Sequence, residues 1–150
     1  MNDLYETDTV AWSERQSELL RRVAAGERLN VAPDWPNIAE EIETLGKNQG
    51  RELASRVAVI LEHLIKLAAS PASEPRAVWR ATIRRERGEI ETLLEDAPSL
   101  RTRVPAVIQN KIARARANAA AALVDSGEVP RCDIGSINYS ADELLGDWMP

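Results

Sequence analysis

Arg56 and His63 are the two residues of this chain whose types and spacing come nearest to a catalytic set. Six residues lie between them, so on a helix their side chains lie two turns apart on one side. An imidazole can act as general base or acid towards a ribose 2′-hydroxyl, while a guanidinium stabilises charge on the reacting phosphate. The structural alternative makes His63 a hydrogen-bonded core residue and pairs Arg56 with Glu52, one turn earlier.

A second hypothesis is a metal site built around His63, the only histidine of the chain. Helical bundles hold metals with inward-facing Glu and His side chains. Glu41 and His63 are the candidate ligands of a single divalent ion, completed by a carboxylate from another helix. A two-metal bundle requires two Glu-x-x-His units, and here Glu62 directly precedes the one histidine. We therefore expect no cofactor.

Ion pairing explains the same charged residues without any chemistry. We expect one or two glutamates of the acidic block at 40–43 to meet the Arg-rich helix at 76–87. Glu86 lies close to the apolar stripe of that helix and needs Arg56 or His63 as a partner, because an inward-facing charge must be neutralised. The residues expected in this polar network are Glu40, Glu41, Glu43, Glu86, Arg80 and Arg84.

The basic residues suggest nucleic acid as a partner only weakly. Those at 76–87 and 101–116 would form one phosphate-binding face if their helices lay side by side. No aromatic residue interrupts the Arg face, and the formal net charge of −5 gives no general attraction to nucleic acid. Solvated helix faces are the favoured interpretation.

The elements that must position these residues are helices. A central helix is expected at about 51–69, with Gly46 and Gly50 weakening the stretch before it. The region 36–70 is therefore either one helix or two, and we favour two nearly collinear segments. An earlier helix is expected from Asp8 or Thr9 to Gly26, and Asp34 should cap the next one. The side chains expected to face inward on these two are Trp12, Leu19, Leu20, Val23, Ile38, Ile42 and Leu45.

Three more helices are expected after the prolines that follow the central one. The first runs from about Glu74 to 97, and the second from Ser99 to about 126, unless Pro105 delays its start by one turn. A short last helix follows Ser140 in a capping-box pattern. No strand-like alternation or hairpin turn occurs. The prediction is an all-α, compact bundle of five or six helices, forming a single domain over 1–150.

The composition indicates a cytoplasmic protein. One cysteine, Cys132, cannot form an internal disulfide, and the acidic N-terminus has no signal-peptide core. No apolar run approaches the roughly 18 residues that a membrane span needs. We expect no membrane association.

Further motifs carry a resemblance to a known family. They are Leu4-Tyr5-Glu6, Ala11-Trp12, Trp35-x-Asn37-Ile38-Ala39-Glu40-Glu41-Ile42-Glu43, Ser55-Arg56, His63-Leu64-x-Lys66, Trp79-x-x-Thr82-Ile83 and Tyr139-Ser140. This pattern resembles the bacterial family of domains of unknown function numbered twenty-nine, over nearly the whole chain. The chain departs from it at Leu67, where a Trp is usual, and at Asn138, where a Pro is usual. The resemblance implies a helical domain and leaves its role open.

The function that follows is a non-enzymatic helical interaction module that binds a protein partner or self-associates, with a homodimer as one form. No catalytic motif stands above background in the sequence. One alternative is an enzyme, since the Arg56 and His63 pair resembles the spaced Arg and His of HEPN-type helical ribonucleases. The other alternative is the metal-binding bundle that uses Glu41 and His63.

Overall fold

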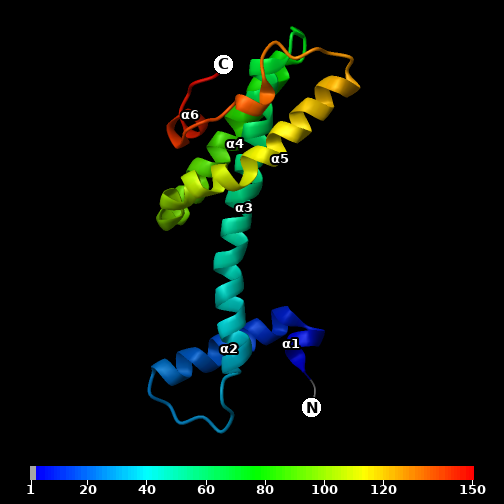
Figure 1. Cartoon of the computed structure of the whole chain (residues 1–150). Coiled ribbons are helices and arrows are strands. Elements are labelled where there is room, and N and C mark those ends of the chain that lie inside the picture. Colours follow the sequence, from blue (N-terminus) through cyan, green and yellow to red (C-terminus); the bar gives the residue numbers. More distant parts are fainter. Residues whose placement is uncertain (1–2) are drawn as a thin grey trace. The chain divides into compact units, whose positions relative to one another are not determined.

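The computed structural model describes residues 3–150, and in that range the chain is all-α, as predicted (Figure 1). No strand occurs among the described residues. The α-helices are α1 (Leu4–Thr7), α2 (Thr9–Ala24), α3 (Trp35–Ala69), α4 (Arg76–Asp96), α5 (Val104–Asp125) and α6 (Ala141–Leu145). Two 3-10 helices, η1 (Pro98–Arg103) and η2 (Ile134–Ser136), join the later ones. The chain divides into two compact units, Met1–Lys47 and Asn48–Pro150.

The prediction of two segments over 36–70 is wrong, because α3 is one continuous helix. Gly46 and Gly50 lie inside it, and each costs about 1 kcal/mol relative to alanine in a helix interior. The good helix formers on either side offset that cost. The start of α3 agrees with expectation: Asp34 Oδ1 accepts from the Asn37 amide at 3.4 Å, and Pro36 occupies the first turn.

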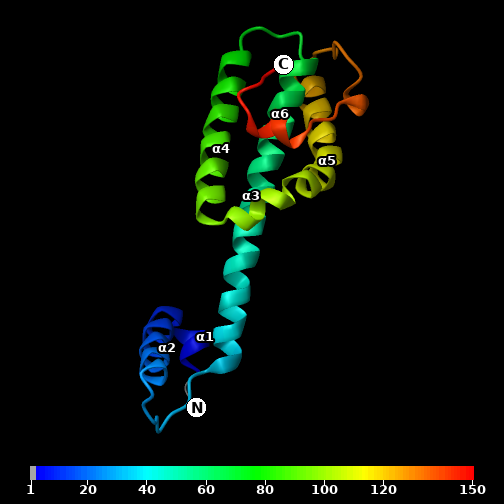
Figure 2. The same cartoon turned by 90° about the vertical axis from the view of Figure 1, so that its left-hand side faces the viewer.

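Local capping determines the bounds of α2 in the first unit. Asp8 accepts from the Ala11 amide at 3.0 Å, and Gly26 ends the helix with a φ of +79°. Trp12 is buried, and its Nε1 donates to Asp34 Oδ2 at 3.1 Å. Figures 1 and 2 show α1 and α2 beside the first turns of α3. The short helix α1 was not predicted.

Three expected core positions are exposed instead. Val23, Ile42 and Leu45 are 39%, 67% and 64% exposed, whereas Leu19 and Ile38 are buried. Ile38 and Ile42 lie one turn apart on the same side of α3. The contact of α1 with this turn goes to Glu41, which accepts from the Tyr5 hydroxyl, and leaves the Ile42 side chain in solvent.

The second unit contains the larger core. The last turns of α3 lie between α4 and α5, and α6 crosses beside them (Figure 2). The fully buried side chains include Leu53, Val57, Ile60, Leu64, Ile83, Ile90, Val104, Leu123 and Leu144. None of the helices within residues 3–150 combines the length and hydrophobicity that a membrane crossing needs.

Two helix starts in the second unit follow from turn chemistry. The expected start of a helix at Ser99 is wrong: that stretch is η1, and α5 begins at Val104 with Pro105 in its first turn. Pro105 fits there because the first-turn amides have no intrahelical partner. The capping box of α6 is present, with Ser140 Oγ accepting from the Glu143 amide at 3.2 Å.

Candidate functional site

Arg56 lies at the centre of a cluster of carboxylates. Its Nη1 donates to Glu86 Oε2 on α4 at 2.9 Å, and its Nε and Nη2 each donate to Glu52 Oε1 at 3.1 Å. Glu89 Oε2 is 3.6 Å from Nη2. The hydrogen bond to Glu86 is the largest cause that raises the pKa of Arg56. Glu86 itself is buried, so this ion pair supplies the partner that its carboxylate requires.

His63 makes a separate contact two turns further along α3. Its Nδ1 lies 2.8 Å from the Val59 carbonyl oxygen, and the residue is half-buried. A carbonyl can only accept, so Nδ1 carries the hydrogen in this bond. The side chains of Arg56 and His63 thus lie on one helix but bond to different groups.

Two glutamates of the acidic block at the start of α3 make contacts within the first unit. Glu41 Oε1 accepts from the Tyr5 hydroxyl at 2.7 Å, and this bond is the main cause that raises the pKa of Tyr5 to about 12. Glu43 Oε2 is 3.8 Å from Lys47 Nζ, and Glu40 is exposed. Within residues 3–150, no three His, Cys, Asp or Glu side chains are grouped so that they could hold a metal ion.

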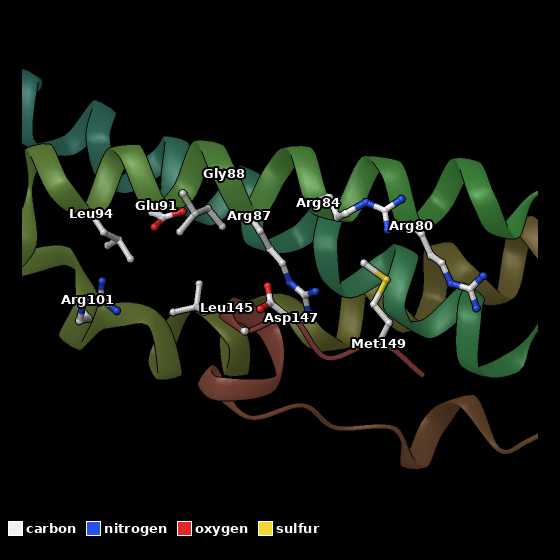
Figure 3. A pocket seen from close by; sticks show the side chains of 12 residues that line it. Arg80, Arg84, Arg87, Gly88, Glu91, Leu94, Arg101, Leu145, Asp147 and Met149 are labelled. Carbon is white, nitrogen blue, oxygen red and sulfur yellow. The ribbon is translucent and has the colours of Figure 1, made fainter.

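A hollow of about 870 Å³ lies in the second unit, beside α4 (Figure 3). Arg80, Arg84 and Arg87 are spaced by four and three residues, so they lie on one face of α4 and line it. The remaining lining comes from α4, η1 and the C-terminal residues; it is Gly88, Ile90, Glu91, Leu94, Arg101, Leu145, Gly146, Asp147 and Met149.

Arg87 holds the C-terminal residues against α4. It is 9% exposed; its Nε donates to the Leu144 carbonyl at 2.8 Å, and its Nη2 donates to the carbonyls of Glu143 and Trp148 at 2.8 and 2.7 Å. Its Nη1 is buried and has no hydrogen-bond partner in the described part of the chain. Burial lowers the pKa of Arg87, and the nearby Asp147 carboxylate acts in the opposite direction. The guanidinium remains charged, since arginine does not deprotonate in proteins.

The other arginines of the hollow have unused donors. Arg84 and Arg101 are exposed and Arg80 is half-buried. Among residues 3–150, no carboxylate lies within ion-pair distance of any of the three. Figure 3 shows Arg80, Arg84 and Arg87 projecting from α4 on the side where Asp147 and Met149 lie. Sequence reasoning placed Arg80 and Arg84 in an ion-pair network and missed this hollow, because the return of the C-terminal residues to α4 has no periodic signal.

The fold and the site define a class: an all-α protein whose second unit carries an arginine-lined hollow. The chain belongs to the family described as "Domain of unknown function DUF29", whose match covers residues 4–148. Comparison with curated proteins and with solved structures finds no match. The expected resemblance is therefore confirmed at the level of the family.

Proposed function

We propose that this chain is a non-enzymatic interaction module whose first unit binds a basic amphipathic helix of a protein partner. The observation that carries the proposal is the pair Ile42 and Leu45, which are 67% and 64% exposed on α3. Trp35, two turns before Ile42 on the same side, is 53% exposed. Burying one such side chain contributes roughly 1.5–3 kcal/mol. This apolar stripe (Trp35, Ile42 and Leu45) is the proposed binding surface.

Gly46 extends the stripe with a position where a partner backbone can come close. It lies one turn after Ile42, and a Cβ built there would meet nothing within 4 Å. A glycine in a helix interior weakens the helix. No neighbour within the described part of the chain requires the missing side chain, whereas a helix packed against the stripe would use the space.

The charge of the first unit indicates the chemistry of the partner. Residues 1–47 hold ten Asp and Glu and five Lys and Arg, a balance of −5 that equals the formal net charge of the whole chain. Glu41 and Glu43 flank Ile42 directly. Complementary potentials favour encounter, and like charges oppose it. A helix with lysines or arginines beside its apolar face fits this surface better than a second copy of the same acidic unit does.

The test uses a synthetic Leu/Lys amphipathic helix as the probe, with the Trp fluorescence of the full chain as the readout. We expect saturable binding to the natural chain and a loss of at least tenfold in affinity with Ile42→Ser and Leu45→Ser combined. A Leu/Glu peptide with the same apolar pattern should not bind. The matched control is Val124→Ser, which changes a valine of α5 that is 74% exposed and should leave binding unchanged.

Two results would overturn the proposal. One is a Leu/Lys peptide that fails to bind, or that binds the variant with both Ile42→Ser and Leu45→Ser as tightly as it binds the natural chain. The other is a homodimer seen by light scattering across a dilution series and lost in the same variant. The second result would assign the stripe to a second copy of the chain.

We also propose a cytoplasmic setting, supported by Cys132, an exposed thiol without a second cysteine in the sequence. A bacterial source is proposed from the resemblance to the bacterial family alone. The contacts of Arg56, His63 and Glu41 add no support to the ribonuclease or metal hypotheses. RNA cleavage by the natural chain that is lost in both Arg56→Ala and His63→Ala, with both variants still folded, would support the first hypothesis. Stoichiometric metal in the purified protein that is lost on changing Glu41 or His63 would support the second.

A further inference from the structure

We propose that the hollow beside α4 binds a small molecule that carries a phosphate or pyrophosphate group. Arg80, Arg84 and Arg101 present guanidinium groups around it, and no carboxylate among residues 3–150 lies within ion-pair distance of them. Guanidinium matches phosphate oxygens in charge and in its forked donor geometry. A bound anion would supply the negative charge that these three guanidinium groups do not receive from any ion pair within residues 3–150.

The three arginines of α4 that line the hollow repel one another when no anion is bound. Arg80 and Arg84 are four residues apart and Arg84 and Arg87 three, and like charges at these spacings destabilise a helix. Glu91, four residues after Arg87, is the one acidic residue that α4 contributes to the lining. The three arginines therefore repel one another along one face, and an anion in the hollow would reverse the sign of that interaction.

Arg87 provides an independent observation that points to an anion. It is 9% exposed, lines the hollow, and leaves Nη1 buried without a hydrogen-bond partner in the described chain. Figure 3 shows its side chain directed from α4 towards Asp147. A buried cation with an unused donor creates a positive potential at the floor of the hollow. The positive charge of Arg87 therefore attracts an anion in the hollow, although its hydrogen bonds are made to the C-terminal residues.

The extent of the hollow favours a small ligand over nucleic acid. Its volume of about 870 Å³ is in the range of small-molecule sites. The basic residues that follow in α5 do not line it; Arg116, for example, donates to the Ile137 carbonyl at 2.6 Å and to Asn138 Oδ1 at 2.6 Å. Glu91 and Asp147 also line it, and they would repel a long polyanion while accepting bonds from ligand hydroxyls.

The experiment is calorimetric titration of the full chain with inorganic pyrophosphate at an ionic strength held constant with chloride. We expect binding that weakens at least fivefold in Arg84→Gln, because the change removes a guanidinium from the lining. Arg84 is exposed, so the variant should keep its fold. We expect tighter binding in Asp147→Asn, which removes a negative charge from the lining. The matched control is Arg114→Gln, an exposed arginine of α5 outside the lining, and it should bind as the natural chain does.

Three outcomes would overturn this inference. They are no binding of pyrophosphate, equal binding by Arg84→Gln, and a loss in Arg114→Gln as large as that in Arg84→Gln. An RNA oligonucleotide that binds more tightly than pyrophosphate and depends on Arg114 would assign the basic residues to nucleic acid instead. The double variant Ile42→Ser, Leu45→Ser should keep its pyrophosphate binding, so failure of the helix-binding proposal is separable from failure of this one.

Discussion

Arg56 Nη1 on α3 donates to Glu86 Oε2 on α4 over 2.9 Å, and the bond joins these two helices beside their apolar contact. Leu53 and Val57 lie beside it on α3, and both are fully buried. The Glu86 side chain is only 10% exposed, so its charge needs this shorter bond, and Arg85 Nη2 adds a longer contact to Oε1 at 3.3 Å. The arginine singled out by its spacing from His63 therefore has a structural role in the second unit.

Replacing Arg56 tests that role. Arg56→Ala leaves the Glu86 carboxylate buried without its main partner, and we expect the free energy of unfolding to fall by about 1.5–3 kcal/mol. Urea denaturation measures the change. Glu52→Ala is the control: it removes only a half-exposed ion pair, so a loss of about 0.5 kcal/mol is expected. Equal effects of the two variants would contradict the assignment.

Gly46→Ala should change stability and binding in opposite directions. The added methyl meets nothing within 4 Å, and alanine stabilises a helix interior by about 0.8–1 kcal/mol relative to glycine. The same methyl would keep a partner helix further from α3, so affinity for the Leu/Lys peptide should drop. Gly88→Ala on α4 also has open space and should raise stability alone. Unchanged peptide affinity in Gly46→Ala would show that the glycine has no role in docking.

Tyr139→Phe should stabilise the second unit. The Tyr139 hydroxyl is buried and has no hydrogen-bond partner among the described residues, so removing it relieves an unpaired polar group. We expect a gain of about 1 kcal/mol in thermal or urea unfolding. Tyr5→Phe should act in the opposite direction, because the Tyr5 hydroxyl donates to Glu41. A loss of stability in Tyr139→Phe would indicate that the hydroxyl has a partner.

Stability should also fall in alkali. The pKa of each tyrosine is raised to about 12, for Tyr5 chiefly by the bond to Glu41 and for Tyr139 chiefly by burial. An unfolded chain releases the phenolic proton near pH 10, so the folded chain binds it more tightly. This contribution is complete below about pH 10 and is lost as the pH rises through about 12. Phenolate absorbance of the native chain measures it, and a midpoint near 10 would contradict the prediction.

Local chemistry made several elements predictable from sequence. Asp8, Asp34 and the box at Ser140 define helix starts because each side chain bonds to amides within three residues. The pairing of Glu86 with Arg56 follows the same logic at longer range, since an inward charge needs an opposite one. Such features depend on few residues, and a sequence displays them directly.

Coverage of a surface could not be predicted in the same way. Periodicity shows that Ile42 and Leu45 lie on the apolar side of α3, but it carries no information on whether another element packs there. Helix propensity around Gly46 is likewise too weak to distinguish one helix from two. The hollow beside α4 depends on Arg87 holding residues far along the chain, and no local pattern signals such a contact.

The way Arg87 holds the C-terminal residues has an evolutionary consequence. The three hydrogen bonds that it makes within residues 3–150 end on main-chain carbonyls, those of Glu143, Leu144 and Trp148. Every amino acid has a main-chain carbonyl, so substitutions at these three positions need not weaken the hydrogen bonds from Arg87. Relatives that keep the arginine could therefore carry other residues at position 147, in the lining of the hollow, and so bind other solutes.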